Sequence, residues 1–96
     1  MKTTRKLPIT SYYFLRTVDE LGRLVIPIEF RNELKLNEDD NIKLSINESN
    51  FESNLDGIGR IKVPIDIRNK YDIKDADKLK VYIENGNIVL ENKYLI

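Results

Sequence analysis

Arginine side chains recur in the same local setting at two places in this sequence. Arg23 follows a glycine and lies four residues before a proline, and Arg31 lies four residues after that proline. Arg60 and Arg68 stand in the same relation to a second glycine and a second proline. A planar guanidinium can hold a phosphate, or the O6/N7 edge of guanine, through two parallel hydrogen bonds. The repeated arginines therefore indicate recognition of nucleic acid.

Five further residues are candidates for the same interface. Asn32 and Asn69 each follow the second arginine of a set and could bond adenine edges or phosphate. Arg16, Arg5 and Lys6 add positive charge without a repeated counterpart. Each arginine could instead be a solvated surface charge, or an ion pair with an acid such as Asp19, Glu20 or Asp56. For Arg5, Lys6 and Lys62 the sequence favours neither interpretation.

Both sets of arginines belong to an internal repeat with a spacing of 37 residues. The stretch 14–46 aligns without a gap with 51–83, and 11 of the 33 aligned pairs are identical. A repeat this short cannot bury its own hydrophobic face, so each copy needs the other as its core partner. We therefore expect one shared core, with an N-terminal extension and strand start (1–13), copy one (14–50) and copy two (51–96).

The local pattern predicts a mainly β chain with two short helices. Strands are expected at 9–18, 23–26, 41–47, 51–56, 60–63, 78–84 and 87–94. Pro27 and Pro64 are expected to open helices over 28–34 and 65–71, because the first helical position needs no N–H. Asn85-Gly86 is a favoured two-residue hairpin turn. The aromatic cluster Tyr12-Tyr13-Phe14 is expected in the core.

Composition excludes several kinds of protein. The 96 residues contain no histidine and no cysteine, which removes the commonest general base and the commonest thiol and metal chemistry. We therefore expect no enzyme activity, no cofactor and no metal site. No apolar run reaches the 18 or more residues of a membrane span, and no signal peptide is recognisable. These features favour a cytoplasmic, nucleoid-associated protein.

The formal net charge of zero weakens a nucleic-acid interpretation without refuting it. DNA-binding domains are usually basic overall. Here, acidic residues cluster after each predicted helix, at 38–40 and at 72, 75 and 77, whereas the arginines lie in the turn and helix segments. Segregated charges can still leave one positive face.

Residues 18–34, VDELGRLVIPIEFRNEL, resemble the DNA-binding segment of AbrB-type transition-state regulators and of their SpoVT and MazE relatives. Residues 55–71, LDGIGRIKVPIDIRNKY, are a more diverged version. The resemblance implies the swapped-hairpin fold, also called a looped-hinge helix, in which two copies interlock into a small β-barrel. It also implies that arginines of the turn and helix segments contact double-stranded DNA. Since the copies are fused here, we expect an intrachain pseudo-dimer that acts as a sequence-specific transcriptional regulator.

The sequence departs from this family in two respects. Copy one continues into copy two without a final strand, so either the long first strand fills the gap or an open edge pairs with a second chain as a homodimer. In addition, Ser53 stands where copy one has Arg16, and the asparagines at 32 and 69 stand where a second helix arginine is often found. The second half should therefore bind DNA more weakly or with a different specificity.

Two alternatives remain open. A MazE-like antitoxin would bind a toxin protein as well as its own operator. Such antitoxins carry a long acidic tail, and this sequence ends shortly after its last predicted strand, so a toxin is a less expected partner. A fused barrel that has lost DNA binding would instead be an oligomerisation or anti-repressor module. The replacement of Arg16 by Ser53 in copy two keeps that alternative open.

Overall fold

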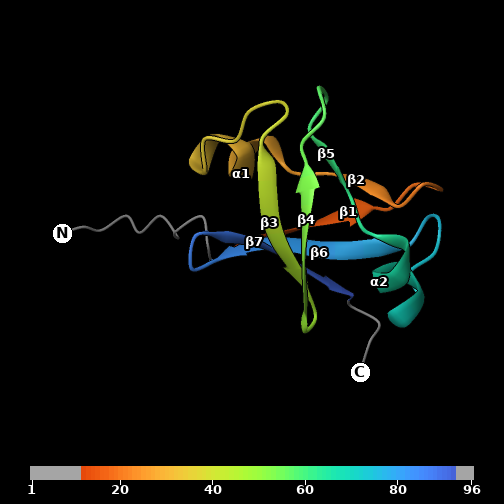
Figure 1. The fold of residues 1–96 in the computed structure, drawn as a ribbon. Coiled ribbons are helices and arrows are strands. Elements are labelled where there is room, and N and C mark those ends of the chain that lie inside the picture. Colours follow the sequence, from red (N-terminus) through yellow and green to blue (C-terminus); the bar gives the residue numbers. More distant parts are fainter. Residues whose placement is uncertain (1–11, 93–96) are drawn as a thin grey trace.

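The computed structural model describes residues 12–92, which form seven strands and two short helices (Figure 1). Copy one supplies β1 (Tyr13–Thr17), β2 (Arg23–Val25), α1 (Ile28–Glu33) and β3 (Asn41–Ile46). Copy two supplies β4 (Ser49–Asn54), β5 (Arg60–Lys62), α2 (Ile65–Lys70), β6 (Lys78–Glu84) and β7 (Asn87–Asn92). The mainly β architecture with two helices is confirmed. The part of the first strand expected at 9–11 lies outside the described residues.

The two copies exchange their first strands. β1 of copy one pairs antiparallel with β6 of copy two, with Phe14 opposite Val81. β4 of copy two pairs antiparallel with β3 of copy one, with Phe51 opposite Leu44. Phe14 and Phe51 are equivalent in the repeat, and so are Leu44 and Val81, so the two pairings are equivalent. The first strand of each copy therefore completes the sheet of the other copy.

The sheet is open, so the expected closed barrel is wrong. Five strands follow the order β1-β6-β7-β3-β4, which leaves β1 and β4 at opposite edges, while β2 and β5 form a separate two-stranded ribbon. β7 joins the two halves, because it pairs antiparallel with β6 and parallel with β3. Copy one lacks a final strand of its own, as expected, but its first strand does not fill that place, because β1 pairs with β6, and β7 of copy two lies beside β3. Only copy two has a fourth strand, and a single such strand bridges the halves without closing the sheet.

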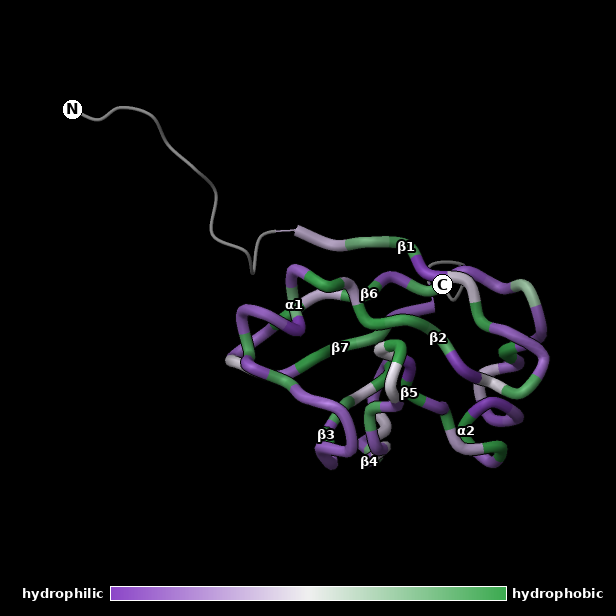
Figure 2. Tube along the Cα trace, turned by 90° about the horizontal axis from the view of Figure 1, so that it is seen from above, coloured by the Kyte–Doolittle hydropathy of each residue, from purple (hydrophilic) through white to green (hydrophobic). Residues whose placement is uncertain are grey.

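The hydrophobic core is one cluster that lies between the ribbon and the sheet. Leu24 of β2 and Ile61 of β5 face it from the ribbon, and Phe30 of α1 and Ile67 of α2 add to it. Figure 2 shows hydrophobic stretches along β2 and β7, with hydrophilic residues gathered in the loops. The inward-facing sheet residues are Ile42, Leu44, Ile46, Phe51, Leu79, Val81, Ile83, Ile88 and Leu90.

The expected aromatic core cluster is only partly present. Phe14 packs against the core, and its ring meets that of Phe30 edge-on with centroids 5.3 Å apart. Tyr12 and Tyr13 are 37% and 57% exposed, so their assignment to the core is wrong. Side chains alternate along an edge strand, and Tyr13 faces outward, where the ammonium of Lys80 lies 4.6 Å from its ring centroid.

Candidate nucleic-acid interface

The ribbon of β2 and β5 presents positive charge on its outer side. Its central pair, Leu24 and Ile61, is buried. Because side chains alternate along a strand, the residues flanking this pair point away from the core. Arg23 lies opposite Lys62, and Val25 lies opposite Arg60. One face of the ribbon is thus core, and the other carries three cations.

A carboxylate orients each ribbon arginine. Asp19 Oδ2 accepts a hydrogen bond from Arg23 Nε at 2.8 Å, and Asp19 Oδ1 accepts one from the Arg23 backbone N–H at 2.8 Å. Asp56 binds Arg60 in the same way, at 2.6 Å from Nε and 2.8 Å from the backbone N–H. The ion pairs that the sequence offered as an alternative are therefore present, and each of them leaves the far end of its guanidinium free.

These contacts lower the pKa of both carboxyls. For Asp19 the largest influence is the hydrogen bond from the backbone N–H of Arg23, which lowers the pKa and outweighs the opposing effect of desolvation. For Asp56 desolvation is the largest single influence and raises the pKa, but the backbone and side-chain hydrogen bonds from Arg60 together outweigh it. Both carboxylates are consequently charged at neutral pH, and each holds its arginine through hydrogen bonds.

Arg31 lies across the glycine turn of the other copy. Its Nε donates a hydrogen bond to the carbonyl of Ile26 at 2.9 Å. Its guanidinium covers Gly59, where an added Cβ would lie 2.5 Å from Arg31 Cζ. Gly59 has a φ of +88°, and its carbonyl accepts the backbone N–H of Ile26 at 2.8 Å. Arg31 of copy one therefore packs on the residue that precedes Arg60 in copy two.

Arg68 repeats this arrangement at the other end of the ribbon. Its Nε donates to the carbonyl of Val63 at 2.9 Å, and its guanidinium covers Gly22, which has a φ of +84°. The Gly22 carbonyl accepts the backbone N–H of Val63 at 2.9 Å. Arg68 thereby packs on the residue that precedes Arg23. Each end of the ribbon therefore carries two arginines, one from each copy.

The four arginines share a mode of anchoring. Each uses Nε, either for a carboxylate or for a backbone carbonyl. Within residues 12–92 their terminal Nη atoms have no hydrogen-bond partner. The free Nη donors of these four cations are therefore available to an anionic ligand.

Lys62, which the sequence left undecided between a contact and a surface charge, is a member of this surface. It is exposed on the outer side of β5, and its backbone N–H donates to Ser53 Oγ at 2.9 Å. The equivalent residues in copy one are Val25 and Arg16, and β1 contacts β2 there. Arg16 Cζ lies 5.4 Å from the centroid of the Phe14 ring. Lys62 and Ser53 thus stand where copy one has Val25 and Arg16, and Arg16 is half-buried, with its Nε buried and without a hydrogen-bond partner within the described residues. The sequence signal for the outward position of Lys62 is that it directly follows the apolar Ile61 in a strand.

The remaining candidates lie away from the ribbon or outside the described residues. Asn32 and Asn69 are exposed on α1 and α2, and their backbone carbonyls accept hydrogen bonds from the residues that end each helix. Their side chains make no hydrogen bond within the described part of the chain. Arg5 and Lys6 fall outside the residues that the structure describes.

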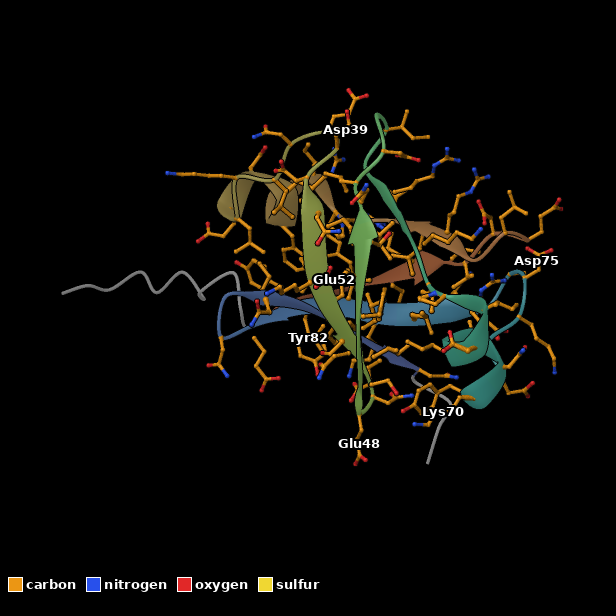
Figure 3. The ribbon with its side chains drawn as sticks, in the orientation of Figure 1. Asp39, Glu48, Glu52, Lys70, Asp75 and Tyr82 are labelled. Carbon is orange, nitrogen blue, oxygen red and sulfur yellow. The ribbon has the colours of Figure 1, made fainter. Side chains whose placement is uncertain are left out.

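Acidic loops border the ribbon. The loop 37–40 is held to the opposite copy by backbone hydrogen bonds from Asp39 to Leu55 at 2.8 Å and from Leu55 to Asp40 at 2.9 Å. The loop 74–77 is bound to Val18 in the equivalent way. Figure 3 shows Asp39 and Asp75 projecting from these two separate loops. The acidic side chains of these loops offset the cations gathered on the ribbon, which reconciles that cluster with the formal net charge of zero.

Within residues 12–92 no group of three or more acidic, histidine or cysteine side chains is placed to hold a metal ion. No helix in the same range has the length and apolar character needed to cross a membrane.

Comparisons with known proteins identify the fold alone. The sequence matches no protein-family model and no curated protein at a significant level. The structure is similar to the solution structure of PHS018 from Pyrococcus horikoshii, with a TM-score of 0.63 and 17% sequence identity. The match covers 88% of this chain and 91% of that one.

Proposed function

We propose that this protein is a sequence-specific, double-stranded-DNA-binding transcriptional regulator of the AbrB-like type. The observation that carries the proposal is the β2–β5 ribbon with a pair of guanidinium groups at each end, anchored through Nε and free at Nη. The exchange of β1 and β4 supports an AbrB-like swapped-hairpin pseudo-dimer, because first strands would cross over if two copies interlocked. Such a regulator would act in the cytoplasm, at the nucleoid.

The ribbon has a suitable size for the major groove. Neighbouring strands lie about 4.8 Å apart, and the major groove of B-DNA is about 12 Å wide and admits a two-stranded ribbon. Within residues 12–92 no helix or strand covers the outer side of β2 and β5, where Arg23, Val25, Arg60 and Lys62 are exposed or half-buried. A ribbon lying in the groove would bring both arginine pairs close to the base edges and phosphates together.

The free edge of each guanidinium fits this role. With Nε occupied, Nη1 and Nη2 form the edge that can present two parallel N–H donors. This edge matches guanine O6 and N7, or two oxygens of one phosphate. Anchoring through Nε reduces the conformational freedom that binding would otherwise remove. Lys62, a flexible point charge, is better suited to phosphate than to bidentate base recognition.

The test compares two double variants with the same change in charge. Arg23→Ala with Arg60→Ala removes one guanidinium from each end of the ribbon. Lys43→Ala with Lys78→Ala removes two exposed cations from the outer face of the sheet. Affinity is measured by fluorescence anisotropy on a duplex selected from a random-sequence pool. We expect the arginine variant to bind at least about tenfold more weakly, from about 1–3 kcal/mol for each bidentate contact, and the lysine variant to bind like the wild type.

Salt dependence supplies a second readout. The logarithm of the affinity should fall with the logarithm of the salt concentration, by roughly 0.9 for each phosphate contact. Because the chain has no histidine, we expect little change in affinity between about pH 6 and pH 8. Equal losses in the two double variants, or a flat salt response, would contradict the proposal. A protein that binds no duplex but self-associates would favour the oligomerisation module instead.

A further inference from the structure

Bulky aliphatic side chains are exposed at equivalent positions in both copies. Leu21 and Ile58 stand at the tips of the two glycine turns and are 48% and 62% exposed. Ile28 and Ile65, the first residues of α1 and α2, are 50% and 58% exposed. Turn tips favour small or polar residues, and a single exposed aliphatic residue would need no explanation. Its recurrence at matching sites in both copies points to contact with a partner.

The turn holds each tip residue and its arginine as one unit. Asp19 Oδ1 accepts the backbone N–H of Leu21 at 2.9 Å and that of Arg23 at 2.8 Å, while Oδ2 accepts Arg23 Nε. Asp56 makes the equivalent bonds to Ile58, at 3.0 Å, and to Arg60. An apolar tip and a guanidinium are therefore presented together in a fixed relation at each end of the ribbon.

We propose that Leu21 and Ile58 contact the C5 methyl groups of thymine in the major groove, beside the groups bound by Arg23 and Arg60. This inference rests on the proposed function and specifies the bases that the ribbon selects. The thymine methyl is the apolar group that base pairs expose in this groove. The guanidinium pairs beside the tips favour a polyanion over an apolar protein surface, which would leave those charges buried and unpaired.

The ribbon register limits the distance between the two thymine contacts. Leu21 lies four residues before Val25, which pairs with Arg60, and Ile58 lies two residues before Arg60. Six residues at about 3.3 Å each span at most about 20 Å. This length corresponds to about six base-pair steps of 3.4 Å. The selected site should therefore hold its two methyl-dependent thymines within about six base pairs of each other.

Replacing thymine by uracil removes the methyl group and leaves base pairing intact, so it provides the test. The full-length protein is titrated with the selected duplex and with duplexes that carry deoxyuridine at one thymine position at a time. We expect two positions at which the wild-type protein loses about fourfold in affinity, the effect of about 0.8 kcal/mol for one buried methyl group. Leu21→Ala should abolish the loss at one position, and Ile58→Ala at the other.

Leu15→Ala is the matched control, because Leu15 is 38% exposed on the outer face of the sheet. It should leave both deoxyuridine effects unchanged. If the thymine and uracil duplexes bind equally well, or if Leu21→Ala and Ile58→Ala keep the wild-type sensitivity, the inference is overturned while the proposed function stands. If the wild-type protein binds no duplex, both fail.

Discussion

Arg31 of copy one covers Gly59 of copy two, and its Cζ lies 2.5 Å from the point that a Cβ on that glycine would occupy. Arg68 covers Gly22 in the same way. Glycine and arginine are thus retained in both copies partly because they pack on each other between the copies. The same contact places an arginine of each copy at each end of the ribbon.

This packing leads to a prediction for Gly59→Ala. An alanine at a φ of +88° is strained by about 1–2 kcal/mol. Its Cβ also occupies the space of the Arg31 guanidinium, so that side chain must move. We expect chemical denaturation to report a loss of stability of about 1–2 kcal/mol, and DNA affinity to fall because Arg31 is displaced from the end of the ribbon.

Gly86→Ala separates these two effects. Gly86 has a φ of +80°, but an added Cβ would meet no atom within 4 Å. This variant should lose a similar amount of stability and keep the wild-type DNA affinity. If Gly86→Ala weakened DNA binding as much as Gly59→Ala does, loss of stability rather than the position of Arg31 would explain both results.

The lowered pKa values of Asp19 and Asp56 predict how stability depends on pH. In the unfolded chain each carboxyl has its ordinary pKa of about 3.9, and in the folded chain the value is lower. The two groups therefore contribute their full stabilisation above the unfolded pKa and lose it as the pH falls through the folded pKa. Asp19→Asn with Asp56→Asn should be less stable than the wild type at pH 7 and should lose less stability on acidification.

Thermal melts between about pH 2 and pH 7 test this pH dependence. Glu20→Gln is the matched control, since Glu20 neighbours Asp19 but is exposed and forms no ion pair within the described residues. Its melting curve should follow that of the wild type. An unchanged acid response in the double aspartate variant would mean that other carboxyls control acid unfolding.

The exchange of first strands predicts that copy one cannot fold alone. In a fragment of residues 1–50, β1 would lack β6, β2 would lack β5, and β3 would lack β7 and most of β4. We expect circular dichroism to show no cooperative unfolding of this fragment as a monomer. Mixing it with a fragment of residues 51–96 should restore a cooperative transition. A concentration-independent, cooperative transition of the first fragment alone would contradict the shared core.

The fold could be read from the sequence wherever a local signal existed. Pro27 and Pro64 predicted the two helix starts, and Asn85-Gly86 predicted its hairpin, where both residues have positive φ. The β3–β4 hairpin was missed because it turns through Asn47-Glu48, which lacks that glycine signal. Asn47 adopts a φ of +52° instead. Which strands become neighbours depends on the packing of both copies and cannot be read from local periodicity.

The sequence identified the cationic residues of the candidate site but not how they are arranged. Repetition singled out Arg23, Arg31, Arg60 and Arg68, but it concealed Lys62, because copy one has valine there. The sequence also set an ion pair with aspartate against contact with DNA, as if one excluded the other. In three dimensions the pairs of Arg23 and Arg60 use Nε and leave Nη free, so the ion pair is compatible with a ligand at the other end of the side chain. Only the three-dimensional structure distinguishes the bonded Nε of a guanidinium from its free Nη atoms.

The difference between the two ends of the ribbon predicts an asymmetric DNA site. Arg16 and Val25 of copy one correspond to Ser53 and Lys62 of copy two, so the ends carry equal numbers of cations but different chemistry. A single chain should therefore select a site without two-fold symmetry. Ser53→Arg with Lys62→Val gives copy two the residues of copy one, and this variant should select a more nearly palindromic site.

Selection from a random-sequence pool, together with the mass of each complex, tests this symmetry. Arg16→Ser with Val25→Lys is the converse variant, because it gives copy one the residues of copy two. It should also make the selected site more symmetric, but the preferred bases should differ, since lysine replaces the planar fork of arginine at both ends. Ser53→Arg removes the hydroxyl that accepts the Lys62 N–H, so the folding of each variant is checked first by its melting curve. If one wild-type chain bound a perfectly palindromic site, the two copies would be equivalent in function despite these four residues, and the ribbon ends would not determine specificity.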